Sequence, residues 1–249
     1  MPVETKVIAL GDSRVRVEVE VSSEEIEREL MRHAEGLGKG RVLAAPHFSR
    51  GKPPGTEVIE RAGRDRVLGD TLRRQIPRWY GEAITEADVK TVGHPTLDMD
   101  SDLPEAGDPF RFSFEVLVKP KARLGPYKGL EVARREPEGA FREAVVDAAV
   151  EAAIVELSDE VVAAAAEEVW ERFEEALSKD ESDTMTYLDA AGKTLEQAID
   201  DAKPEAAREL ARESVLEAIA EVEGIDDPDQ SLRLRKVIDL LVEHAIPIR

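Results

Sequence analysis

Residues 47–54, H-F-S-R-G-K-P-P, combine the residue types best suited to binding a polyanion. Arg50 and Lys52 flank Gly51, and Phe48 precedes them. Gly51 permits a tight turn, and the two prolines that close the motif fix φ and favour extended geometry before them. The motif therefore predicts a short, stiff tip that presents two cations in a defined direction toward an anionic surface. The alternative is a solvated Gly/Pro turn with ordinary surface charges.

Acidic pairs are the only other groups with catalytic potential. Glu167 with Glu168, or Asp200 with Asp201, could serve acid/base chemistry or bind a divalent cation. Adjacent helical positions point about 100° apart, however, and 30 acidic residues share residues 137–249, so solvated charge is the favoured interpretation. Glycine-rich phosphate loops and a nucleophile elbow are missing from the sequence. We expect no catalytic residue, no cofactor and no enzymatic activity.

Cysteine and histidine usage argues against a metal site. The chain has no cysteine, which excludes disulfides and thiolate zinc sites. Its four histidines, at positions 33, 47, 94 and 244, are scattered without pairing at helical spacing. No apolar run reaches about 18 residues, and the first ten residues do not resemble a signal peptide. The sequence predicts a soluble, cytoplasmic protein with no metal and no membrane partner.

Trp170, Phe173 and Leu177 lie at positions i, i+3 and i+7 of an expected helix. Such a stripe is typical of core packing. The alternative is a partly exposed patch that binds an apolar partner, and we keep these three residues as candidates for such a binding surface.

Charge is distributed unevenly along the chain. Residues 1–136 contain 23 basic and 24 acidic residues, whereas residues 137–249 contain 11 basic and 30 acidic residues. Within the first part, residues 39–66 carry seven basic against three acidic residues, a net charge of +4. We infer one anion-docking region and one acidic, self-repelling body.

The first half has the pattern of an α+β unit, in which a sheet is combined with helices. Alternation over residues 6–21 predicts a hairpin that turns at Gly11 and Asp12, and S-S-E-E at 22–25 is a capping box for a helix to about Leu37. Residues 56–84 predict two helices interrupted near Gly63, with a second break or kink at Pro77. Two further strands are expected at 89–97 and 110–118.

The second half reads as helical throughout after a Gly/Pro-rich connector. We expect one helix lined by apolar residues from Phe141 to Leu157 and a second that starts at Ser158. Thr194 to Gln197 is another capping box, and Pro204 is expected near the start of a further helix that ends at Gly224. A last helix is expected over 232–246. The predicted division is 1–119 as the sheet-plus-helices domain, 120–137 as an extended linker, and 138–249 as the helical domain.

These segments resemble trigger factor, the bacterial ribosome-associated chaperone, over nearly the whole chain. The family's docking loop follows G-F-R-x-G-x-x-P, which Phe48, Gly51 and Pro54 match, while His47 and Ser49 stand in place of its glycine and arginine. Further similarity lies in the following segments: V-L-G-D at 67–70, G-H-P at 93–95, P-K-A-R-L-G-P-Y-K-G-L-E-V at 120–132, Y-L-D-A-A-G-K-T at 187–194 and K-P-E-A-A-R-E-L at 203–210.

The resemblance implies a ribosome-binding domain and a client-binding helical domain. Between these two domains the chain differs from the typical family pattern. Typical members carry an FKBP-like prolyl isomerase domain after the linker, whereas here Glu136 passes almost at once to Phe141. The similarity thus implies a shortened form without that domain. By this resemblance Phe48, Ser49, Arg50, Gly51 and Lys52 form the ribosome-binding tip.

The function that follows is an ATP-independent chaperone that docks near the ribosomal exit tunnel, on ribosomal protein and RNA, and shields nascent or unfolded chains. One alternative is a peptidyl-prolyl isomerase by family membership, although aromatic residues make up only 4% of the chain. Another is a holdase or adaptor that works away from the ribosome. His47 and Ser49, which replace the glycine and arginine of the docking pattern, would then reflect the loss of ribosome docking. Homodimerisation is left open by the sequence.

Overall fold

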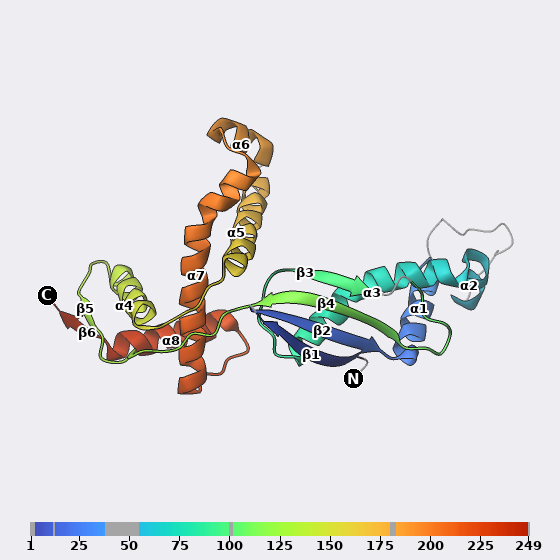
Figure 1. The fold of residues 1–249 in the computed structure, drawn as a ribbon, viewed down its shortest axis with the longest axis horizontal. Coiled ribbons are helices and arrows are strands. Elements are labelled where there is room, and N and C mark those ends of the chain that lie inside the picture. The colour runs from blue at the N-terminus through green and yellow to red at the C-terminus, as the bar shows by residue number, and fades with distance from the viewer. Residues whose placement is uncertain (1–2, 12, 38–54, 100–101, 180–182, 249) are drawn as a thin grey trace. The chain divides into compact units, whose positions relative to one another are not determined.

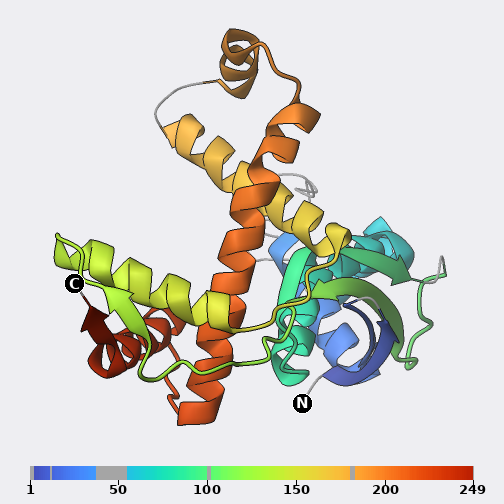
Figure 2. The ribbon, with the colours of Figure 1, turned by 60° about the vertical axis from the view of Figure 1, so that its left-hand side comes forward.

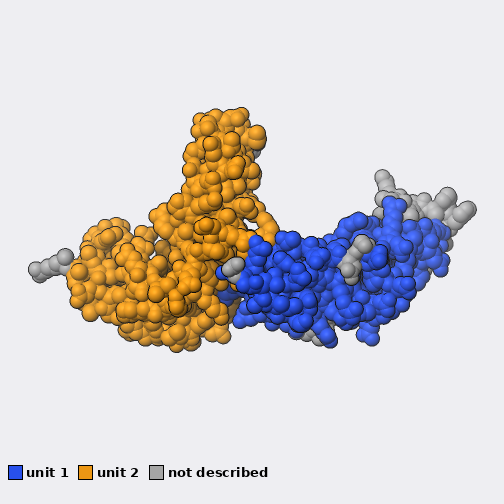
Figure 3. All heavy atoms as spheres, in the orientation of Figure 1, with its two compact units in different colours: residues 1–90, 95–116 blue, residues 91–94, 117–249 orange. Residues whose placement is uncertain are grey.

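The computed structural model describes residues 3–11, 13–37, 55–99, 102–179 and 183–248. Its contacts group into two units, which comprise residues 1–90 with 95–116 and residues 91–94 with 117–249 (Figure 3). The predicted tip at 47–54 lies outside the described residues. The fold is mixed α+β, with an antiparallel sheet near the N-terminus and a helical C-terminal part, which confirms the predicted fold class.

The N-terminal sheet has the strand order β1-β2-β4-β3 (Figure 1). Its strands are β1 (Val3–Gly11), β2 (Arg14–Val21), β3 (Thr91–Met99) and β4 (Phe110–Val118). The predicted hairpin is confirmed: β1 and β2 pair antiparallel with Val7 opposite Val17, and Gly11 and Ser13 both adopt positive φ at the turn. Strict alternation sends one side of β2 and β4 into the core.

Three helices share one apolar core with that side of the sheet. They are α1 (Ser23–Leu37), α2 (Gly55–Ala62) and α3 (Arg64–Glu86). Trp79 of α3 is fully buried beside Phe110, with ring centroids 6.3 Å apart, and Ile26 and Leu30 of α1 join the same cluster. The predicted break at Gly63 is confirmed, because Gly63 has φ of 86° between α2 and α3, whereas α3 continues through Pro77.

The second unit is built around one long helix, α7 (Leu195–Glu223). α5 (Asp159–Lys179) and α6 (Thr184–Ala191) accompany the N-terminal half of α7, and α4 (Glu138–Ala152) and α8 (Gln230–His244) pack on its C-terminal half (Figure 2). Two short strands, β5 (Glu131–Ala133) and β6 (Ile246–Ile248), pair in parallel. No helix in the described ranges is long and apolar enough to cross a membrane.

The segment predicted as a linker contributes to the core of this second unit. Val132 of β5 is buried, and Leu124, Tyr127 and Leu130 pack against the cluster formed by α4, α7 and α8. Arg123 exchanges two backbone hydrogen bonds with Ile154, each 2.9 Å long. The division into 1–119, 120–137 and 138–249 stays a prediction.

Three expectations about helix extent were wrong. The last helix, expected over 232–246, ends at His244, and Ile246 begins β6 instead. The helix that begins near Phe141 ends at Ala152, so Ile154 and Leu157 do not continue it; Ile154 instead bridges to Arg123. Pro204 does not start a new helix but lies inside α7. Proline removes one backbone donor and its ring crowds the carbonyl four residues earlier, but contacts of Ala206 and Leu210 with α5 hold the helix through that position. The capping box of Thr194 with Gln197 is confirmed.

Candidate binding surfaces

The base of the predicted tip is formed where α1 ends and α2 begins. Phe48, Ser49, Arg50, Gly51 and Lys52 themselves lie outside the described residues, so their roles stay predictions. Gly55, the first residue of α2, is buried against α1: a Cβ at Gly55 would lie 3.0 Å from the Met31 Cε and 3.2 Å from its carbonyl oxygen. This close approach anchors the point at which the chain re-enters the helical layer.

Two buried carboxylates of α1 hold this helix against α3. Glu25 and Glu29 are each only 1% exposed. Arg78 of α3 bonds Glu25 at 2.5 Å and lies 3.6 Å from Glu29, which also accepts a 2.9 Å hydrogen bond from Gln75. Arg28 and Arg32, one helical turn along α1, form the remaining ion pairs of the two carboxylates. Buried charge is tolerated only when it is paired, so this network fixes the register of the two helices.

His33 extends the polar layer between α1 and α3. Thr71 donates its hydroxyl proton to the Val67 carbonyl at 2.7 Å, so it can only accept at its 2.8 Å contact with His33 Nδ1. His33 therefore carries its proton on Nδ1, and no described group bonds its buried Nε2. Burial lowers the pKa of His33, and the positive charge of Arg74 lowers it further. Both effects favour the neutral form of the His33 ring.

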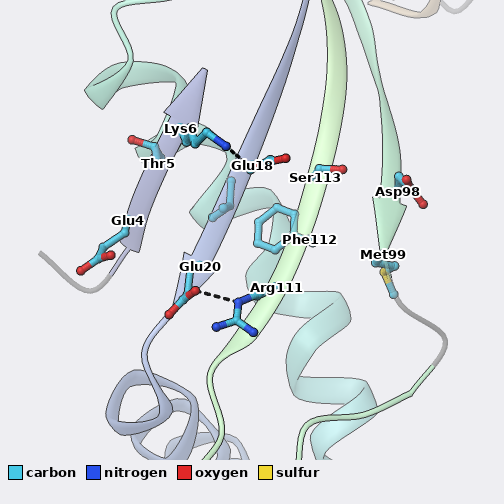
Figure 4. A pocket seen from close by; sticks show the side chains of 11 residues that line it. Glu4, Thr5, Lys6, Glu18, Glu20, Asp98, Met99, Arg111, Phe112 and Ser113 are labelled. Carbon is cyan, nitrogen blue, oxygen red and sulfur yellow. Dashed lines mark hydrogen bonds and ion pairs between the residues drawn. The ribbon is translucent and has the colours of Figure 1, made fainter. Parts of the chain in front are cut away.

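The outer face of the sheet carries paired charges rather than a reactive group. A hollow of about 500 Å³ is lined by β1, β2, β3 and β4 (Figure 4). Lys6 bonds Glu18 at 3.1 Å, and Arg111 bonds Glu20 at 2.7 Å. Within the described residues no group of three or more potential metal ligands is found. This face is a solvated surface with two ion pairs, to which Glu4 and Asp98 add further negative charge.

An aromatic cluster lies where α5 meets α6. Trp170 and Phe173 of α5 have ring centroids 5.3 Å apart, and Tyr187 of α6 stands 4.9 Å from Phe173 and 6.4 Å from Trp170. Trp170 is 8% exposed and packs with Leu188 and Ala198, so it belongs to the core. Phe173 is half-buried at the edge of this cluster. Of the predicted client-binding residues, Trp170 and Phe173 are brought together, and Leu177 is not part of the cluster.

The apolar surface beside this cluster was not found from the sequence. Tyr187 is 43% exposed, and Met185 and Leu195 are also exposed. The sequence did contain a local signal for α6. Asp183, the residue before T-M-T-Y-L-D, caps this helix by accepting a hydrogen bond from the Thr186 amide at 3.3 Å. The helix was missed because α6 is short and lies between two longer helices with clearer apolar periodicity.

Two family models match most of the chain. The model described as bacterial trigger factor protein matches residues 3–157, and the model of the trigger factor C-terminus matches residues 131–243. The chain belongs to the trigger factor family. The two matched segments overlap, so no middle domain separates them.

Individual trigger factors from several bacteria are similar to parts of this chain. That of Syntrophomonas wolfei is 34% identical over 128 residues, 51% of this chain and 28% of its own length. That of Nocardia farcinica is 36% identical over 132 residues, 53% of this chain and 28% of its own length. That of Streptomyces avermitilis is 29% identical over 227 residues, 90% of this chain and 43% of its own length. The chain thus spans less than half the length of these relatives.

A solved structure of the trigger factor chaperone, described for promiscuous substrate recognition in folding and assembly activities, has the same fold. It superimposes with a TM-score of 0.58 at 14% sequence identity, and the match covers 96% of this chain and 99% of that one. At this level of identity the likeness supports the fold alone.

The trigger factor motif G-H-P at residues 93–95 has a clear structural reason. Gly93 has φ of 71°, and a Cβ there would lie 2.9 Å from the Cβ of Ala164 on α5. Its amide donates to Glu168 at 2.5 Å, and the next residue, His94, bonds Glu171 at 2.7 Å through Nε2. The hydrogen bond and the charge of Glu171 raise the pKa of His94. Only glycine allows the strand to approach α5 so closely.

Proposed function

We propose that this chain is an ATP-independent chaperone that docks on the ribosome through residues 47–54 and shields emerging chains with the α5–α6 surface. The observation that carries this proposal is the match of both trigger factor family models across residues 3–157 and 131–243. Several similar bacterial proteins are themselves trigger factors.

The docking step uses the basic tip. Arg50 and Lys52 meet ribosomal RNA phosphates or an acidic ribosomal protein near the exit tunnel, while Phe48 inserts against an apolar surface. Gly51 allows the turn, and Ser49 occupies the position where the family pattern has an arginine. The packing of Gly55 on Met31 supports the proposal, because it gives the tip a rigid base.

The client-holding step uses Phe173 and the neighbouring exposed apolar side chains of α6 and α7. Phe173, Met185, Tyr187 and Leu195 each expose part of their surface, whereas Trp170 supports them from the core. Burial of apolar surface contributes about 25 cal/mol per Å², so a few partly covered side chains give weak binding. Weak binding permits release without ATP, since affinity differences act mainly on the rate of dissociation.

We also infer that the chain has no peptidyl-prolyl isomerase activity. The overlap of the two family-model segments supports this inference, because it leaves no residues for an intervening isomerase domain. The measurement is the cis-to-trans isomerisation rate of a proline-containing peptide. A rate above the uncatalysed rate that increases with protein concentration would contradict the inference.

The central test is cosedimentation with bacterial ribosomes across a salt series. We expect binding that weakens with salt, because exposed charge interactions are screened over about 10 Å at 0.1 M salt. The double variant Arg50→Ala, Lys52→Ala should lose binding. The control Arg172→Ala, Lys193→Ala removes two exposed cations elsewhere and should bind as the parent does. Absence of binding by the parent chain even at low salt would overturn ribosome docking.

A second candidate function is that of a holdase or adaptor that acts away from the ribosome. His47 and Ser49 favour it, because they depart from the glycine and arginine of the family's docking pattern. The substitution Ser49→Arg separates the two functions. It should strengthen ribosome binding if the tip docks there and leave cosedimentation unchanged if the protein works elsewhere.

A further inference from the structure

A cleft of about 500 Å³ between α4, α7 and α8 concentrates arginine within the acidic half of the chain. Arg142, Arg212 and Arg235 line it with a single acidic residue, Glu143. Residues 137–249 as a whole contain 11 basic against 30 acidic residues. The charge of this cleft is therefore opposite to that of the surface around it.

Two of the three arginines have no partner among the residues that the structure describes. Seven of the ten described basic residues in this half form an ion pair, namely Arg142, Arg172, Lys193, Lys203, Arg208, Arg233 and Lys236. Lys179, Arg212 and Arg235 form no hydrogen bond or ion pair with another described residue. These two arginines leave two positive charges in one cleft for an anionic ligand to neutralise.

The two arginines project from helices that pack in one core. Arg212 belongs to α7 and Arg235 to α8, and the fully buried Val215 and Val237 bring these helices together in one core. A site on packed helices retains its geometry better than a site on loops. The neutral form of arginine is inaccessible at physiological pH, so both positive charges persist.

The residues that line the cleft indicate which kind of ligand would fit it. Leu234 and Ile238, both half-buried, lie beside the arginines, and Arg142 is already paired with Asp239 of α8. An apolar wall beside two free cations suits a carboxylate that has an apolar side chain next to it. A long polyanion such as nucleic acid would be repelled by the surrounding acidic surface.

We propose that this cleft binds an acidic polypeptide segment, in which a Glu or Asp carboxylate pairs with Arg212 and Arg235. An adjacent apolar side chain of that segment packs on Leu234 and Ile238. The inference rests on the proposed chaperone function only in that the segment belongs to a client. The cleft gives a protein of net charge −20 a place to hold acidic segments that it would otherwise repel.

The test uses fluorescence anisotropy with two labelled, end-capped peptides, one of repeating Ala-Glu-Leu and one of repeating Ala-Gln-Leu. We expect the parent chain to bind the Glu peptide roughly tenfold more tightly, as charge-assisted hydrogen bonds in a partly apolar site permit. Arg212→Gln, Arg235→Gln should remove that preference. The control Arg172→Gln, Arg208→Gln changes the net charge equally at two exposed, paired sites and should keep the preference.

Equal affinity of the parent for both peptides, or a preference retained by the cleft variant, would overturn the proposal. Sedimentation velocity gives a further decisive outcome, because a dimer that dissociates in the cleft variant would assign the cleft to a second copy of this chain. Circular dichroism and thermal unfolding verify that the variants fold. Ribosome cosedimentation of the cleft variant should be unchanged, so failure here and failure of ribosome docking are distinguishable.

Discussion

Arg78 is expected to stabilise the N-terminal unit far more than its partly exposed position indicates. It bridges the α1 carboxylates of Glu25 and Glu29, which are 1% exposed, while Arg78 itself is 41% exposed. Removal of one partner from a buried ion pair costs about 3–5 kcal/mol. Because Arg28 and Arg32 still pair with the two carboxylates, we expect Arg78→Met to lower the free energy of unfolding by about 2 kcal/mol.

The assay exploits the distribution of tryptophan. Trp79 lies in the core of the N-terminal unit and Trp170 in the second unit, so in a Trp170→Phe background fluorescence during urea unfolding reports on Trp79 alone. The matched control is Arg73→Met, whose ion pair with Asp70 is exposed. We expect that control to cost at most about 0.5 kcal/mol. Equal losses in the two variants would refute the stabilising role of the buried carboxylate network.

Three further perturbations test the second unit. NMR titration should place the pKa of His94 above its usual range, because Glu171 bonds it, and Glu171→Gln should lower that pKa. The folded pKa is raised, so the stabilising contribution is complete below the unfolded pKa and is lost as pH rises through the folded pKa; at 71% exposure it is small. Gly125→Ala should destabilise this unit by about 2–3 kcal/mol in thermal unfolding, because the new Cβ would lie 2.0 Å from the Ala152 carbonyl oxygen. Phe173→Ser should weaken suppression of client aggregation, measured by light scattering, about fivefold, an affinity loss near 1 kcal/mol.

Each of these outcomes has an internal control. Gly139→Ala places a Cβ where no atom lies within 4 Å, so a loss of stability as large as that of Gly125→Ala would contradict the packing argument. Leu177→Ser changes a half-buried residue of the same helix outside the aromatic cluster. Equal loss of activity in Leu177→Ser and Phe173→Ser would contradict a client surface centred on Phe173. If Glu171→Gln leaves the pKa of His94 unchanged, the hydrogen bond between His94 and Glu171 is contradicted.

Local patterns predicted those elements whose signals depend on nearby residues. The hairpin over residues 6–21 and the capping box at Thr194 were found because alternation and capping are short-range properties. Pro204 misled the prediction because a proline usually marks a helix start, and only packing against α5 carries α7 past it. Ile154 looked helical by spacing, but its backbone partner is Arg123, 31 positions earlier.

The candidate binding surfaces also differ in whether they depend on contiguous residues or on the packing of distant ones. The tip at 47–54 stays a prediction, and it could be made from the sequence because the motif is contiguous. Glu25 was expected to complete a capping box with Ser22, and its amide does bond the Ser22 hydroxyl, but its buried carboxylate pairs with Arg78. Only the packing of α3 shows that pairing and the burial of Glu29. Arg212 and Arg235 could not be linked from the sequence, because their proximity depends on the packing of α7 against α8.

The composition of α7 explains how one helix serves both a firm body and an adaptable arm. Its C-terminal half buries Val215, Leu216 and Ile219 against α4 and α8, whereas its N-terminal half meets α5 largely through alanine, including Ala206. Burial is stabilising in proportion to apolar area, and alanine offers little. The arm therefore has a lower free energy of local opening than the body. A readily opened arm suits the proposed client surface, which requires exposed side chains that adjust to varied apolar segments.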